Sequence, residues 1–110
     1  MNRQKAKGDR AEREAAALLC ELLGVPARRQ LGAGRSDDVG DICGVPDTVI
    51  QVADWQDLAQ ALRVKPPAAE VQAVNAGVPW GVAMLRLRGG DWRVCMTVDA
   101  WAAMWREATS

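Results

Sequence analysis

The sequence predicts an α/β domain in which a central mixed β-sheet is flanked by helices. Three observations lead to this fold class. Segments with helical periodicity alternate along the chain with short apolar segments typical of strands. Glycines and prolines fall between these segments, where turns are required. The 110 residues, 49% hydrophobic and 25% charged, have the composition of a globular protein, so we expect a single domain over residues 1–110.

The first expected element is a helix from about Lys5 to Leu23, with Gly24 as its C-terminal stop. Two neighbouring stripes form its buried face, namely Ala11-Ala15-Leu18-Leu22 and Glu12-Ala16-Leu19-Leu23. Glu12 heads one of these stripes and is therefore aimed at the body of the protein. Glu14 lies on the solvent side, one turn from Arg10, where an ion pair can form.

The remaining elements are short strands and helices. Strands are expected near residues 27–31, 39–43, 48–53, 80–88 and 91–98, and helices from Asp54 or Asp57 to about Val64, at 68–76, and from Thr97 or Asp99 onward. Pro66 and Pro67 are expected to separate the second helix from the third, which ends at Gly77. The predicted order is α-β-β-β-α-α-β-β-α.

The strand at residues 48–53 carries the most informative side chains. It forms an antiparallel hairpin with the strand at residues 39–43, around a four-residue turn. Because side chains alternate along a strand, Gln51 and Ala53 share one face, while Ile50 and Val52 share the other. Whatever Gln51 contacts, Ala53 therefore lies on the same side of the sheet.

Cysteine and histidine usage restricts the possible chemistry. Three widely spaced cysteines indicate neither a disulfide framework nor a zinc site, and the chain has no histidine. Any metal must therefore bind oxygen ligands, which favours Mg²⁺ or Mn²⁺. The sequence has no apolar run long enough for a membrane span or a signal peptide, so we expect a cytoplasmic protein.

Charge is unevenly distributed although the net charge is zero. Residues 1–36 hold eight Lys or Arg against four Asp or Glu, and residues 37–60 hold six Asp and no basic residue. A basic segment beside an acidic centre suits a polyanionic substrate that is brought to a cation site. A solvated, charged first helix explains the same pattern equally well.

Three stretches of the first half carry a resemblance to a known family. KGDRAEREAAALL (residues 7–19), GRSDDVGDI (34–42) and VIQVAD (49–54) together resemble the archaeal-type Holliday-junction resolvases, nucleases of the PD-(D/E)-x-K superfamily with small phage and bacterial relatives. The second half is similar only in its order of elements. The resemblance implies a restriction-endonuclease-like core, a symmetric homodimer, and metal-dependent cleavage of branched DNA.

Carried over by position, the resemblance assigns five residues. Glu12 is the helix carboxylate and Asp41 the central metal ligand. Gln51 falls where the family has its second acid, and Ala53 falls where it has its lysine. Ser36 corresponds to a loop position near the scissile phosphate. Phosphodiester hydrolysis needs a divalent ion held by hard oxygens, which Asp41 and Glu12 provide.

Gln51 and Ala53 depart from the family pattern. The Gln51 amide oxygen can bind a hard cation without a formal charge, or the residue is simply a polar side chain on a half-exposed strand. The Ala53 methyl group can neither orient water nor stabilise the transition state. Three explanations stay open: an engineered loss of the lysine, transfer of its role to another residue, or a domain that binds junctions without cutting them.

The best substitute for the lysine is Lys65, the only lysine after Lys7. Its flexible stem could reach back toward Gln51, although a plain solvent-exposed lysine fits the sequence as well. Contacts to DNA phosphates are expected from the basic residues near the proposed entry, which are Lys5, Lys7, Arg10, Arg13, Arg28, Arg29 and Arg35.

The five tryptophans are expected to fill the core and a dimer surface rather than to stack on bases. Three of the side chains on the last helix, Trp101, Met104 and Trp105, share one side. A protein-interaction module that uses this side and binds no nucleic acid is the remaining alternative function. The basic first segment and the Asp41 hairpin argue against it.

Overall fold

A computed structural model describes residues 3–30 and 40–110 of the chain. It contains three helices and five strands, which follow one another as α1 (Arg3–Leu23), β1 (Arg28–Arg29), β2 (Ile42–Cys43), β3 (Thr48–Ala53), α2 (Leu58–Ala76), β4 (Trp80–Arg86), the short 3-10 turn η1 (Arg88–Gly90), β5 (Trp92–Cys95) and α3 (Val98–Thr109). Most expected strands are present but shorter than the sequence suggested.

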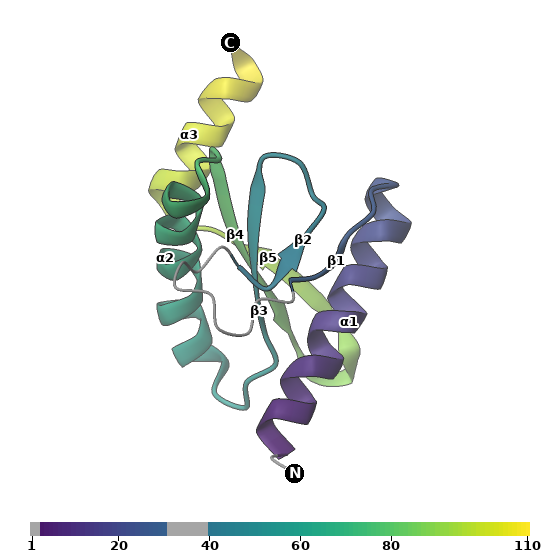
Figure 1. Ribbon diagram of the computed structural model, residues 1–110. Coiled ribbons are helices and arrows are strands. Elements are labelled where there is room, and N and C mark those ends of the chain that lie inside the picture. The colour runs from purple at the N-terminus through teal and green to yellow at the C-terminus, as the bar shows by residue number, and fades with distance from the viewer. Residues whose placement is uncertain (1–2, 31–39) are drawn as a thin grey trace.

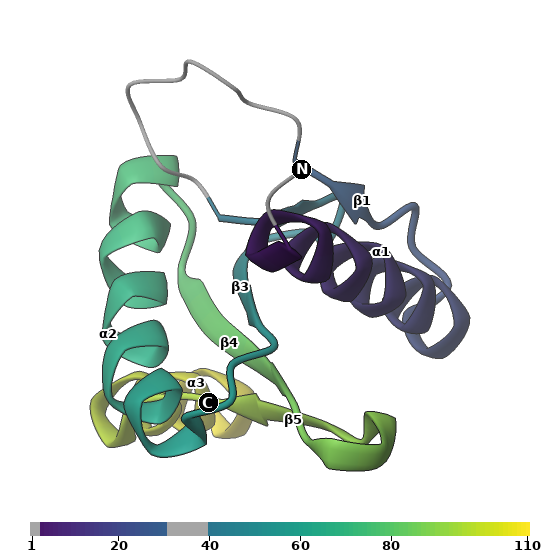
Figure 2. The same cartoon turned by 90° about the horizontal axis from the view of Figure 1, so that it is seen from below.

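The strands form one sheet in the order β1-β2-β3-β4-β5. β3 and β4 are parallel, and the other neighbouring pairs are antiparallel. The parallel pair is joined by α2, because two parallel strands need a long crossover connection. Figures 1 and 2 show α1 and α2 on opposite sides of this sheet. The predicted α/β class with a central mixed sheet is therefore confirmed.

The face of the sheet under α1 is filled by large apolar side chains. Ile42, Ile50 and Val52 from β2 and β3 pack with Met84 of β4 and with alanines of α1 such as Ala15. All of these side chains are buried. Burial of an apolar helix stripe against an apolar sheet face is what holds α1 in place. The predicted alternation along β3 is confirmed on this side.

The face under α2 is built from small residues. Ala53 of β3 packs with Ala61 of α2 and with Ala83 and Leu85 of β4. The helix lies so close that a Cβ built on Gly81 would stand only 2.2 Å from the carbonyl oxygen of Ala69. A glycine in β4 is therefore required by the approach of the helix backbone.

α2 corrects one prediction of the sequence. It is a single helix that continues through Pro66 and Pro67, where two helices were expected. Its ends agree with the sequence, since Asp57 accepts a hydrogen bond from the Gln60 N–H at 3.0 Å and Gly77 closes the helix with φ 69°. The two backbone bonds that the prolines remove would end on Leu62 and Arg63, which are exposed residues, and burial of the opposite side of the helix outweighs the loss.

α3 lies at one end of the molecule and packs only lightly on β4 (Figure 1). Thr97 caps it by accepting a hydrogen bond from the Ala100 N–H at 3.1 Å. Trp101 and Trp105 are each 54% exposed, and none of the five tryptophans is buried. Trp92 packs against the core from its edge, so tryptophan contributes to the core only there, and the buried positions are filled by alanine, valine, isoleucine, leucine and methionine. No helix in the described ranges has the length and apolarity needed to cross a bilayer.

Candidate functional site

Asp41 stands at the start of β2, where the regular hairpin ladder ends. Its N–H donates to the Ile50 carbonyl, and its carboxylate accepts from the Val52 N–H, both at 2.8 Å. These two bonds flank Gln51, so they fix Asp41 beside that residue. The carboxylate replaces a backbone acceptor of the ladder and is thereby held in one orientation.

Gly40 makes this arrangement possible. Its φ is +98°, and a Cβ at this position would lie 2.8 Å from Val49 Cγ1 and 2.9 Å from the Ile50 carbonyl oxygen. Only glycine combines this backbone angle with such a close approach. The glycine of the Gly-Asp-Ile stretch thus turns the chain so that Asp41 meets β3.

Glu12 projects from α1 toward the same region and is 22% exposed at its side chain. Burial, and then repulsion from Asp41, raise the pKa of Glu12 above its ordinary value. Its Oε1 accepts a hydrogen bond from Nε of Arg29 at 3.2 Å, and Nη2 of Arg29 donates to Asp9 at 2.8 Å. Arg29 thus ties β1 to two carboxylates of α1.

Gln51 is 4% exposed and faces α2. Its amide nitrogen donates to Oε1 of Gln72, which is itself buried. Its amide oxygen accepts from Nζ of Lys65 at 3.1 Å. Gln51 is therefore not a half-exposed strand residue, because both ends of its amide are engaged inside the interface between β3 and α2.

Lys65 lies within α2 rather than beyond the helix that follows β3. The reach from Lys65 to Gln51 that the sequence suggested is present. Its ammonium also lies over the ring of Trp55, 5.3 Å from the centroid. The interpretation of Lys65 as a plain solvent lysine is therefore wrong, since an amide oxygen and an aromatic ring hold it.

Ala53 is 2% exposed and does not border an open space. The volume that a longer side chain would need is occupied by Ala61 of α2 and by Leu85 of β4. α2, the helix that presents Lys65, thus also covers Ala53. Gln72 of α2 also contacts Gln51, whereas Glu70 of the same helix accepts a hydrogen bond from Thr97.

The basic residues proposed to contact DNA divide into two groups. Those with acidic partners are Lys5 with Asp9 at 3.1 Å, Lys7 with Asp54 at 3.7 Å, and Arg29 with Asp9 and Glu12. Arg10, Arg13 and Arg28 are exposed and form no ion pair with any other described residue. The ion pair expected between Arg10 and Glu14 is absent, because Glu14 instead bonds Arg86 and Trp92 at 3.1 and 2.9 Å. Arg35 and Ser36 lie outside the described residues.

The donor set suits a hard divalent cation. Asp41 and Glu12 supply carboxylates close enough to repel each other, a repulsion that a bound cation would relieve, whereas the Gln51 amide oxygen already accepts from the Lys65 ammonium. Within residues 3–30 and 40–110, no three acidic or cysteine side chains gather as a metal-binding group. Asp41 occupies the centre of the candidate site, with Glu12 on the α1 side and Gln51 and Lys65 on the α2 side.

Comparisons with protein-family models, with curated proteins and with solved structures return no match for this chain. The geometry around Asp41 and the resemblance of the first half to the junction resolvases therefore carry the functional proposal.

Proposed function

We propose that this chain is an Mg²⁺- or Mn²⁺-dependent endonuclease that hydrolyses phosphodiester bonds in branched DNA, as the Holliday-junction resolvases do. The order α-β-β-β-α-β of its first six elements, with β3 and β4 parallel, supports a restriction-endonuclease-like core. The observation that carries the proposal is the 3.1 Å hydrogen bond from Lys65 Nζ to Gln51 Oε1. This bond brings an ammonium to the strand face that Gln51 shares with Ala53, where the alanine itself supplies none.

One packing arrangement accounts both for the absence of a lysine at position 53 and for the use of Lys65. A long side chain at Ala53 would push α2 away from the sheet, since Ala61 packs directly against it. With alanine there, the helix approaches closely enough for Lys65 to reach Gln51. A lysine on the helix thus takes over the role because the helix occupies the space of the lysine on the strand.

Each residue has a role that follows from its contacts. Asp41 and Glu12 would hold the metal ion, and the Gln51 amide oxygen would hold the Lys65 ammonium beside it. When bound, the ion supplies charge neutralisation at the scissile phosphate and a more acidic water molecule. Lys65 orients that water and stabilises the negative charge that develops at phosphorus. Gln72 fixes the Gln51 amide so that its oxygen points at Lys65.

The test is cleavage of a labelled four-way DNA junction with added Mg²⁺ or Mn²⁺. We expect Asp41→Asn to abolish cleavage, and Lys65→Ala to lower the rate by about 100-fold or more, because the charge stabilisation is lost. Arg63→Ala, on the exposed side of α2, is the control that removes a positive charge away from the site. If Lys65→Ala cuts at the rate of the unaltered protein, Lys65 has no catalytic role. Cleavage that survives in Asp41→Asn would rule out the proposed metal site.

A second candidate function is binding of branched DNA without cleavage. The favouring observation is that Gln51 brings no negative charge and that Arg29 already neutralises Glu12, so the site attracts a divalent ion less strongly than a full set of carboxylates. Junction binding measured by gel shift, with no cleavage at any Mg²⁺ or Mn²⁺ concentration, would establish this function instead.

We also propose that two copies of the chain associate, as the resemblance implies. The supporting feature is the apolar side of α3, where Val98 is 80% exposed and Trp101 and Trp105 are each 54% exposed. Light scattering should give twice the mass of one chain, and Trp101→Glu should give a single chain without unfolding it. A monomer that captures a different protein through this side would instead indicate an interaction module.

A further inference from the structure

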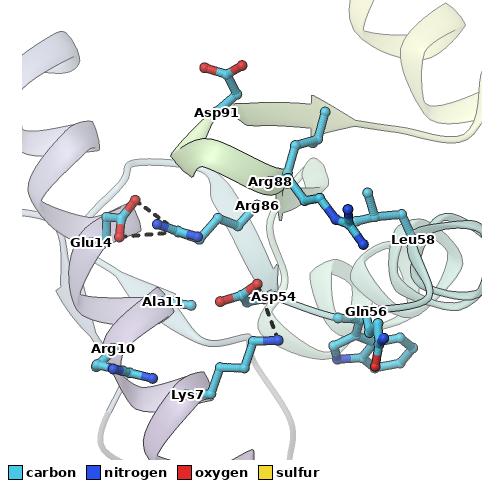
Figure 3. A pocket seen from close by; sticks show the side chains of 12 residues that line it. Lys7, Arg10, Ala11, Glu14, Asp54, Gln56, Leu58, Arg86, Arg88 and Asp91 are labelled. Carbon is cyan, nitrogen blue, oxygen red and sulfur yellow. Dashed lines mark hydrogen bonds and ion pairs between the residues drawn. The ribbon is translucent and has the colours of Figure 1, made fainter.

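A charged cleft of about 810 Å³ lies beside the candidate site. Its walls are α1, the segment that follows β3, and the β4–β5 hairpin (Figure 3). The lining residues that carry charge are Lys7, Arg10, Arg86 and Arg88 on the positive side and Glu14, Asp54 and Asp91 on the negative side. The cleft therefore brings together the basic first helix and a hairpin from the second half of the chain.

The ion pairs inside the cleft leave Arg10, Arg88 and Asp91 without an ion-pair partner among the described residues, so the lining carries a net charge of +1. Lys7 pairs with Asp54 at 3.7 Å, and Arg86 pairs with Glu14 at 3.1 Å. Arg10 and Arg88 are exposed, and neither forms an ion pair with another residue in the described ranges. In Figure 3 these two arginines lie on different walls, with the two ion pairs between them.

The cleft is also linked to the candidate site through Trp55. This side chain lines the cleft and is 37% exposed, and the Lys65 ammonium lies over its ring. Lys65 in turn donates to Gln51. A ligand in the cleft would thus lie against the aromatic ring that supports the proposed catalytic lysine.

We infer that this cleft receives the sugar–phosphate backbone of one DNA strand, with Arg10 and Arg88 each contacting a phosphate. The inference rests on the proposed function and adds to it a strand path and a contact residue, Arg88, from the second half of the chain. Arg10 and Arg88 lie on different walls, so each can present its guanidinium fork to a separate phosphate of one strand. The cleft is open to solvent on one side rather than fully enclosed, so a strand can enter it.

Binding of a fluorescently labelled four-way junction tests the inference, measured by anisotropy in EDTA over a series of salt concentrations. The variants are Arg88→Gln and Arg10→Gln, and Arg63→Gln on the exposed side of α2 is the matched control. We expect each cleft variant to lose roughly 3- to 10-fold in affinity and to lower the slope of log K against log salt by about 1, since one phosphate contact is lost. The control should bind like the unaltered protein.

The outcomes separate this inference from the function on which it rests. If the unaltered protein binds the junction and both cleft variants bind equally well with the same salt slope, the strand path is wrong while the nuclease proposal stands. If the unaltered protein binds no DNA even at low salt, both are wrong. If Arg63→Gln loses as much as Arg88→Gln, binding is spread over the surface and the cleft has no special role.

Discussion

The two faces of the sheet differ in the size of the side chains that pack on them. Under α1, branched and long apolar side chains such as Ile50, Val52 and Met84 fill the space between helix and sheet. Under α2, Ala53, Ala61 and Ala83 leave almost no space, and a buried glutamine pair lies among them. One face therefore gains stability from the volume it buries, and the other from close backbone approach.

This difference explains which face of the sheet can hold buried polar groups. A face filled by large apolar groups has no place for buried polar atoms, because each would need a partner. A helix held close by small residues can deliver amide and ammonium groups directly to a strand, as Gln72 and Lys65 do at Gln51. The amide and ammonium groups of the proposed active site thus depend on the α2 face, while Glu12 belongs to the rim of the α1 face.

The largest effect is expected from Ala53→Lys, which adds a long charged side chain to the α2 face. We expect a loss of about 3 kcal/mol or more in the free energy of unfolding, because the ammonium is buried and unpaired and the helix is displaced. Urea denaturation measures the change. Ala17→Lys, on the exposed side of α1, is the matched control and should change stability by about 0.5 kcal/mol or less. A stable Ala53→Lys protein that gains cleavage would show that Ala53 faces the active site and that close packing there is dispensable.

Gly81→Ala tests the same close approach with a single methyl group. The added Cβ would stand 2.2 Å from the Ala69 carbonyl oxygen, so the helix must move, at a cost of about 2 kcal/mol in the free energy of unfolding. Gly8→Ala in α1 is the control, since its Cβ meets no atom within 4 Å and alanine favours a helix. Equal stability of the two variants in urea would mean that α2 is not held as closely as described.

A smaller loss of stability is expected from substitutions in the buried pair Gln51–Gln72, and its size depends on whether one or both residues are replaced. Gln72→Leu removes the acceptor of the Gln51 amide and should cost about 1 to 2 kcal/mol in the free energy of unfolding. Adding Gln51→Leu removes the stranded donor but also the acceptor of Lys65, so the double variant should recover only part of that loss. A double-mutant cycle in urea measures the coupling. Strictly additive losses would show that the two amides do not act as a pair.

The smallest effect concerns the rim of the α1 face. Burial and the nearby Asp41 raise the pKa of Glu12 above its ordinary value of 4.5, so ionisation of Glu12 weakens the fold. Its contribution to stability is complete below about pH 4.5 and is lost as the pH rises through the higher folded-state pKa.

Glu12→Gln removes this dependence. The melting temperature of the variant, relative to the unaltered protein, should therefore rise between about pH 4 and pH 7, by a few degrees at most. Glu21→Gln, on the exposed side of the same helix, controls for the amide itself. A constant difference in melting temperature across this range would contradict the raised pKa.

Some features were predictable because they depend on nearby residues. The alternation of Ile50 and Gln51, the Asp57 cap and the Gly77 stop follow from local rules, and all three are confirmed. The reach of Lys65 to Gln51 could be suggested from the sequence because α2, which carries Lys65, follows directly after β3, which carries Gln51.

Other features depend on contacts between distant segments, which local rules do not contain. Pro66 and Pro67 suggested a break, yet burial of α2 against the sheet overrides their local preference. The bond from Arg29 to Glu12 joins residues 17 apart, and that from Trp92 to Glu14 joins residues 78 apart. The charged cleft exists only because the β4–β5 hairpin meets α1, so Arg88 could not be assigned to it from the sequence.

The two prolines of α2 also affect how this helix moves. Four backbone hydrogen bonds normally join the turn that ends at Lys65 to the turn that follows it, and Pro66 and Pro67 lack the N–H groups for two of them. The first half of α2 is therefore less firmly connected to the second half along the helix axis. Amide hydrogens at residues 60–65 should exchange with deuterium faster than those at residues 69–76. Lys65 thus belongs to a segment that can open briefly on its own while the rest of the helix stays folded.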